Sequence, residues 1–116
     1  LTPYTPQTHH IVDAQVIAAM KPSSLLINLS RGGCLDEIAL MDALREKRIA
    51  GAALDVFSSE PLPPESPLWD LPNLIVTPHI GGFSDIYHEQ ALPIVAANMA
   101  DYAQGGIGAL KGRLDR

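Results

Sequence analysis

The sequence predicts an α/β fold built around a parallel sheet. Three apolar runs of strand length occupy residues 24–29, 51–57 and 74–77. Helical spacing precedes the first run, separates the first two and follows the last, while a loop separates the second run from the third. Strands joined in this order form a parallel sheet with right-handed crossovers.

The helices are predicted from capping residues and apolar spacing. A short helix at 14–20 follows Asp13, a good N-terminal cap, and ends at Lys21-Pro22. The run at 24–29 is continuously apolar, which is typical of a strand buried on both faces. A second helix, at about 36–47, follows the cap Asp36. Its apolar side is expected to consist of Ile38, Met41, Leu44 and Ile49.

The second half of the sequence contains a long loop and a long helix. Residues 58–73 contain five prolines and no hydrophobic period, and irregular loops of that length in a compact domain are usually functional. In this loop Trp69 is expected to be a packing residue. One helical pattern runs from Ser84 to about Gln104, and Pro93 should kink or interrupt it.

Composition excludes several classes of function. The 116 residues carry a net charge of -5 with a pI near 5.1, so nothing indicates binding to nucleic acid or to an anionic membrane. No apolar run approaches a membrane span of about 18 residues, and no histidines or cysteines show metal-ligand spacing. Cys34 is the only cysteine, which suits a reducing cytoplasm. The chain opens inside a proline-containing loop without Met, so we expect it to be a segment of a longer protein.

Three polar residues follow the apolar runs and suggest an active site. Arg31, Glu60 and His79 each come after one run, and carboxyl ends of parallel strands meet at the ligand-binding edge of an open sheet. A histidine can exchange a proton near neutrality, a carboxylate can orient it, and an arginine fork can grip a carboxylate. Asp55 adds a charge within an apolar run, which is costly to bury without partners.

These groups together suit the reduction of a small 2-oxo acid. His79 would protonate the oxygen, Arg31 would hold the carboxylate, and the hydride would need a cofactor because no side chain supplies one. Taken singly, each residue has a structural explanation: Arg31 as a surface charge, Glu60 as a solvated loop residue, His79 as a cap for the following turn. Their joint position at one edge favours the functional interpretation.

Several segments resemble one family in order and spacing. They are residues 1–8 (LTPYTPQT), 26–33 (LINLSRGG), 50–62 (AGAALDVFSSEPL) and 73–82 (NLIVTPHIGG), and they look like the D-isomer-specific 2-hydroxyacid dehydrogenases. The resemblance implies the second half of a Rossmann-type, doubly wound parallel sheet at 1–83. It also implies a C-terminal helix and tail at 84–116 that returns towards a substrate domain.

The resemblance also implies roles for individual residues. His79 would be the general acid/base, Glu60 its partner and Arg31 the substrate clamp. The residues expected to contact NAD or NADP are Thr2, Pro3, Leu29, Ser30, Arg31, Asp55, His79, Gly81 and Gly82. The choice between the two cofactors is not decided by this sequence. The family usually dimerises through the cofactor domain, so a homodimer is expected by analogy.

Two hypotheses about function therefore follow from the sequence. The first is an oxidoreductase that transfers a hydride between NAD(P)H and a small 2-oxo or 2-hydroxy acid, as part of a longer chain. The alternative is a non-catalytic NAD-sensing or dimerisation module derived from the same fold. The Gly-rich pyrophosphate loop of the family does not occur in these residues, so the isolated chain is expected to bind cofactor poorly and to be inactive.

Overall fold

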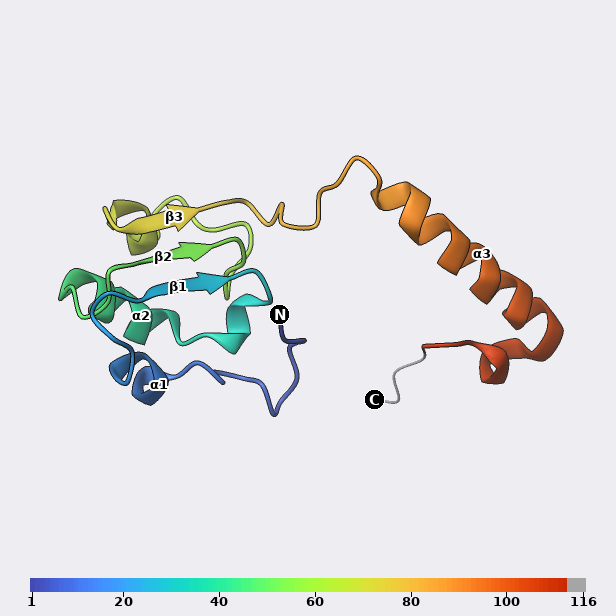
Figure 1. Ribbon diagram of the computed structural model, residues 1–116, viewed down its shortest axis with the longest axis horizontal. Helices are drawn as coiled ribbons and strands as arrows, with labels where there is room; N and C mark the ends of the chain where they lie inside the picture. The colour runs from blue at the N-terminus through green and yellow to red at the C-terminus, as the bar shows by residue number, and fades with distance from the viewer. Residues whose placement is uncertain (113–116) are drawn as a thin grey trace. The chain divides into compact units, whose positions relative to one another are not determined.

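The fold consists of two compact units, which we describe separately. The computed structural model describes residues 1–112; residues 113–116, the end of the predicted segment 84–116, lie outside the described residues. The first unit covers Leu1–Gly81 and the second begins at Gly82. Figure 1 shows the strands and the first two helices within the first unit and the long helix within the second.

The first unit is built on a three-stranded parallel sheet. Its strands are β1 (Leu25–Asn28), β2 (Gly51–Leu54) and β3 (Leu74–Val76), in the order β1-β2-β3 (Figure 1). The predicted parallel α/β fold is confirmed. Each strand is shorter than its apolar run. Just past the end of β2, the Asp55 N–H donates to the carbonyl of Asn28, the last residue of β1, at 3.1 Å. The segments that follow the three strands therefore start from one edge of the sheet.

Capping residues start both helices of this unit. Helix α1 spans Ala14–Ala18, and the Asp13 carboxylate accepts the backbone N–H groups of residues 15 and 16. Helix α2 spans Glu37–Arg45, and the Asp36 carboxylate accepts the N–H of residue 39. These bonds satisfy N–H groups that have no partner within the helix. Both predicted caps are confirmed.

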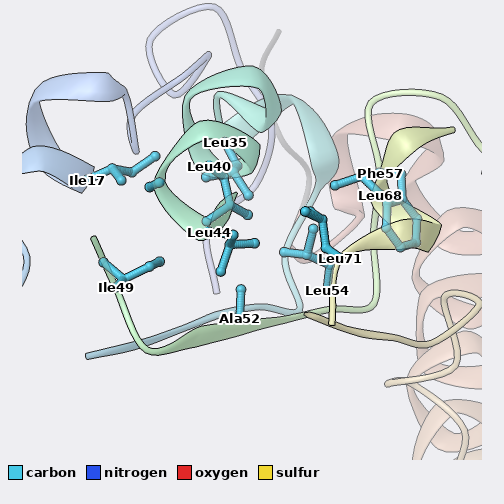
Figure 2. Close-up of a cluster of buried hydrophobic side chains, with 11 residues drawn as sticks. Ile17, Leu35, Leu40, Leu44, Ile49, Ala52, Leu54, Phe57, Leu68 and Leu71 are labelled. Carbon is cyan, nitrogen blue, oxygen red and sulfur yellow. The ribbon is translucent and has the colours of Figure 1, made fainter. Parts of the chain in front are cut away.

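The core lies between α2 and one face of the sheet. Leu40, Ala43 and Leu44 form the buried stripe of α2 and pack in one cluster with Leu54 of β2 (Figure 2). Full burial of a leucine side chain contributes about 1.5–3 kcal/mol, so this stripe fixes which side of α2 faces the sheet. The prediction that Ile38 belongs to this side was wrong. Ile38 is 70% exposed, because it lies two positions from the start of the buried 40–43–44 set and so faces away.

The opposite face of the sheet is not covered in the same way. Leu25 and Ile27 of β1 are 68% and 65% exposed, and Ile75 of β3 is 67% exposed. Ile27, Ala53 and Ile75 are paired directly across the three strands, so they form one apolar row. The prediction that the first strand is buried on both faces was wrong, because Leu25 and Ile27 of β1 are exposed. The continuous apolar run does not distinguish a covered face from an uncovered one.

The second unit contains helix α3, which spans Tyr87–Gly105, and a short 3-10 turn at Gly106–Ala109. Pro93 lies inside α3, which continues through it (Figure 1). A proline removes one backbone hydrogen bond of a helix without necessarily ending it. Of the two outcomes expected at Pro93, a kink or a break, the break does not occur. Among residues 1–112, no helix is both long and apolar enough to cross a membrane.

Candidate active site

His79 and Glu60 form a hydrogen-bonded pair beyond the ends of β3 and β2. The two atoms joined are His79 Nδ1 and Glu60 Oε2, 2.7 Å apart. The other oxygen, Oε1, accepts the backbone N–H of Phe57 at 2.8 Å, so both carboxylate oxygens are held. The hydrogen bond from His79, followed by the bond from Phe57 and the charges of His79 and Arg31, lowers the pKa of Glu60, although burial acts against this. Glu60 is thus an ionised acceptor for the ring.

This pairing leaves one ring nitrogen of His79 for chemistry. An ionised carboxylate at Nδ1 favours the tautomer with a proton on Nδ1, so Nε2 is the atom that can exchange a proton with a ligand. The His79 side chain is half exposed, which makes Nε2 accessible. The arrangement is that of a general acid/base oriented by a carboxylate.

Asp55 fastens the turn that carries His79. Its Oδ1 accepts the Thr77 hydroxyl and the N–H of Ile80, and its Oδ2 accepts the N–H of Gly81 at 2.7 Å. His79 itself has a φ of 55°, in the left-handed region that few non-glycine residues adopt. Such a conformation persists only where its surroundings hold it, and Asp55 holds the residues on both sides of it.

The surroundings of Asp55 also stabilise its charge. The hydrogen bond from Thr77, supported by those from Ile80 and Gly81, lowers the pKa of the Asp55 carboxyl, against the opposite effect of burial. The residue is only 2% exposed. A Cβ on Gly81 would lie 2.9 Å from Asp55 Oδ2, so a side chain there would push the turn away. Three hydrogen bonds therefore offset the predicted free-energy cost of burying the Asp55 charge.

Arg31 lies on the other side of Glu60. Both side chains line a cavity of about 560 Å³. The side chain of Arg31 is exposed, and its Nη1 donates to the carbonyl of Ser30 at 2.6 Å. Sequence reasoning missed three further lining residues of this cavity, Tyr4, His9 and His10. Only their place in the loop before α1 pointed to them, because the histidines have no metal-ligand spacing.

A second, mainly apolar cavity of about 520 Å³ borders His79. Glu60 and His79 line it together with apolar residues of the proline-containing loop and of β3. Trp69 is among these, and its Nε1 donates to the carbonyl of Pro63 at 2.9 Å. The prediction that Trp69 packs in the loop is not borne out as burial, because the residue is 51% exposed and is tied to the loop by this hydrogen bond. Glu60 therefore lies between a cavity containing a guanidinium and a largely apolar one.

The residues expected to contact the cofactor divide into three groups. Asp55, His79 and Gly81 lie in the turn just described, and the Leu29 side chain lies 3.8 Å from the position of a Cβ on Gly81. Thr2 lines a small hollow of about 160 Å³ with Leu29 and Ser30, while the Pro3 carbonyl faces Cys34. Gly82 belongs to the second unit, so its place relative to the site is not described.

A comparison with protein families identifies the chain. The family model described as "D-isomer specific 2-hydroxyacid dehydrogenase, NAD binding domain" matches residues 1–81. The chain belongs to this family. The match covers the whole first unit, including the turn that carries His79 and the loop that carries Glu60.

Curated relatives and solved structures agree with this assignment. The chain is 54% identical over 79 residues to glyoxylate/hydroxypyruvate reductase B of Pectobacterium carotovorum, covering 68% of this chain and 25% of that protein. It is 44% identical over 103 residues to D-3-phosphoglycerate dehydrogenase of Methanocaldococcus jannaschii, covering 89% of this chain and 20% of that protein. The chain thus spans about a quarter or less of the length of these two relatives.

Solved structures of dehydrogenases reproduce the fold. A D-isomer specific 2-hydroxyacid dehydrogenase from Xanthobacter autotrophicus Py2, in complex with NADPH and MES, matches with a TM-score of 0.86 at 36% identity. The match covers 99% of this chain and 46% of that one. An NADPH-dependent glyoxylate/hydroxypyruvate reductase from Sinorhizobium meliloti, in complex with NADP and sulfate, matches with a TM-score of 0.84 at 35% identity, covering 99% and 37%.

Apolar side chains lie at the surface beside the Asp55 turn. Leu29 and Ile80 are 50% and 41% exposed beside the Asp55 turn, so they present apolar surface against which a planar ring can pack. The pattern G-x-G-x-x-G, which cradles a pyrophosphate in dinucleotide-binding folds, does not occur among residues 1–112.

Proposed function

We propose that the protein to which this chain belongs reduces a small 2-oxo acid to the D-2-hydroxy acid, reversibly, with NADH or NADPH. The observation that carries the proposal is the His79–Glu60 pair at 2.7 Å with Arg31 across the same carboxylate. The curated relative from Pectobacterium is named for glyoxylate and hydroxypyruvate, which belong to this substrate class.

The residues of this chain suit three tasks in that reaction. Arg31 can grip the substrate carboxylate with two N–H groups, and a guanidinium next to the carbonyl polarises it. His79 donates the proton from Nε2 to the carbonyl oxygen. Its Nδ1 keeps its own proton, which remains hydrogen-bonded to Glu60. The cofactor, when bound, supplies the hydride that reaches the carbonyl carbon. Hydride plus proton converts the 2-oxo acid to the 2-hydroxy acid, which balances the reaction.

The residues proposed to hold the nicotinamide end are those around the Asp55 turn. Leu29 and Ile80 offer apolar surface, and Thr2, Pro3, Ser30, Gly81 and Gly82 are the further contacts carried over from the family. We place the protein in the cytoplasm as a homodimer, by analogy with the family. The single, buried thiol of Cys34 agrees with a reducing compartment.

The decisive experiment replaces His79 by Gln in the full-length protein. Oxidation of NADH and of NADPH is followed with glyoxylate, hydroxypyruvate and pyruvate. Loss of the general acid should lower kcat about 10²–10⁴-fold, while cofactor binding, measured by fluorescence, stays close to wild type. His88→Gln, on the exposed surface of α3, is the matched control and should leave the rate unchanged.

The same assay separates the two hypotheses about function. A wild-type protein that binds NADH and consumes none with any 2-oxo acid would support the non-catalytic module instead. A His79→Gln variant that retains the wild-type rate would reject the assigned role of His79. The isolated chain should show no turnover, and measurable NADH oxidation by it would contradict that part of the proposal.

A further inference from the structure

Glu37 makes a long-range contact with the segment that carries Glu60. Glu37 is the first residue of α2, and its Oε1 accepts the backbone N–H of Ser58 at 2.6 Å, across 21 residues of sequence. Ser58 lies within residues 57–60, which we call the Glu60 segment. A charged acceptor makes this a stronger hydrogen bond than a neutral one.

A second, independent contact fixes the same segment from the 3-10 turn Gly32–Cys34, which follows β1. A Cβ on Gly32 would lie 1.9 Å from the carbonyl carbon of Phe57 and 2.3 Å from the Ser58 nitrogen. Only glycine allows this approach of two backbones. Gly32 directly follows Arg31, so the backbone beside Arg31 touches the backbone of the Glu60 segment.

The position of this segment sets the geometry of the candidate acid/base pair. Glu60 Oε1 is held by the N–H of Phe57, one residue before Ser58, and Oε2 meets His79 at 2.7 Å. A shift of the backbone at residues 57–58 therefore moves the carboxylate relative to the ring. Misplacement of a catalytic group by about 1 Å can cost roughly 10²-fold in rate.

We propose that Glu37 is a positioning residue of this site: by holding the Ser58 N–H it sets where Glu60 meets His79. Glu37 touches neither ring nor ligand and acts through the Glu60 segment alone. The proposal rests on the proposed function for its effect on rate, but its effect on the geometry of Glu60 does not depend on any reaction.

The alternative explanation of Glu37 is a favourable charge in the first turn of α2. Two substitutions separate the alternatives, because one removes the charge of the side chain and the other shortens it. Glu37→Gln removes the charge but keeps an acceptor oxygen at the same distance. Glu37→Asp keeps the charge but withdraws the oxygen by one methylene. Glu37→Ala removes both, and Glu46→Ala, at the solvent-exposed end of α2, is the matched control.

The experiment uses the full-length protein without ligand and two readouts. The first is the pKa of the Glu60 carboxyl, followed by carbon-13 NMR; the second is kcat and KM for the 2-oxo acid. In Glu37→Ala and Glu37→Asp the Glu60 pKa should rise towards its ordinary value, as the contact with His79 that lowers it weakens. The same variants should lose about tenfold in kcat with little change in KM. Glu46→Ala should resemble wild type in both readouts. Glu37→Gln should change both readouts less than Glu37→Asp and Glu37→Ala, because its amide oxygen still reaches the Ser58 N–H but accepts a weaker hydrogen bond.

Two results would overturn the proposal. One is an unchanged Glu60 pKa and kcat in a folded Glu37→Ala protein. The other is a wild-type Glu37→Asp together with an impaired Glu37→Gln, which would assign the effect to the charge at the start of α2. Failure of the proposed function would look different, because His79→Gln would then keep its rate while the Glu60 pKa still responded to Glu37.

Discussion

The two sides of the candidate site differ in how firmly hydrogen bonds hold their side chains. On one side, His79 is held by Glu60, and the turn around it is held by Asp55 through three hydrogen bonds. On the other side, Arg31 is exposed, and among residues 1–112 its side chain bonds only to the carbonyl of its own neighbour. The side proposed to transfer the proton is therefore preorganised by hydrogen bonds, whereas the side chain proposed to bind the carboxylate has no such support among residues 1–112.

The two sides should therefore respond differently to substitution. Groups that are already oriented lose little freedom at the moment of reaction. A flexible arginine can instead accept acids of different size, because its fork need not match one carboxylate position beforehand. Changes on the His79 side should therefore affect kcat, and changes on the Arg31 side should affect KM.

After His79→Gln, the largest effect is expected from Asp55→Ala in the full-length protein. The substitution leaves the N–H groups of Ile80 and Gly81 without their acceptor and frees the strained turn at His79. We expect kcat to fall about 10²-fold, with a KM that changes much less. Thr77→Val, which removes one hydroxyl partner of Asp55 and keeps the carboxylate, should show a smaller loss of the same kind. Equal rates in Asp55→Ala and wild type would show that the turn keeps its shape unaided.

Arg31→Lys should produce the opposite signature. A lysine keeps the positive charge but loses the planar fork that binds a carboxylate in two places. Since hydrogen bonds to charged groups contribute about 1.5–3 kcal/mol, KM for the 2-oxo acid should rise roughly 10- to 100-fold while kcat falls less. Steady-state kinetics at several substrate concentrations make the measurement. A fall in kcat with constant KM would remove the proposed contrast between the two sides.

The free energy of unfolding should depend on pH through Asp55 and Glu60. The pKa values of Asp55 and Glu60 are lowered in the folded state, so both groups stabilise the protein above their unfolded values of about 4. This stability is lost as the pH falls through the lowered values. The free energy of unfolding, from urea titrations, should drop below about pH 4 because of these groups. Glu60→Gln should reduce the drop, and an unchanged pH dependence in that variant would speak against the ionised pair.

The smallest effect is expected for Trp69→Phe, in the loop beside the second cavity. The substitution keeps an aromatic ring and removes the hydrogen bond to the Pro63 carbonyl. The protein should lose about 0.5–1.5 kcal/mol in its free energy of unfolding, and the rate constants should stay near wild type. A large change in kcat would mean that the loop around Trp69 controls the position of Glu60 more tightly than Glu37 does.

The sequence predicted the sheet well because apolar runs and their polar ends are local signals. Arg31, Glu60 and His79 were placed at one edge from those ends alone, and the structure brings Glu60 next to both of the others. Which face of α2 is buried was predicted less well. Ile38 and Leu40 both fit a helical spacing, and only contact with the sheet decides between them.

Contacts between distant residues were not predictable from the sequence. Nothing near Glu37 indicates that its carboxylate reaches Ser58, and nothing near Thr77 indicates a bond to Asp55. The contact of Glu37 with Ser58 arises where the start of α2 meets the segment that follows β2. The contact of Thr77 with Asp55 arises because β2 and β3 pair in parallel and end side by side. The role of Asp55 as the anchor of the His79 turn likewise became visible only when the strand ends were aligned.

The apolar row across the sheet has a practical consequence for handling this segment alone. Ile27, Ala53 and Ile75 lie in register on a face that neither α1 nor α2 covers within the first unit, with Leu25 beside them. Such a surface favours self-association in a concentrated solution. Replacing Ile27 and Ile75 by threonine keeps a residue that suits a strand and adds a hydroxyl to each. That pair of changes is the first to make before the segment is prepared at the concentrations that NMR requires.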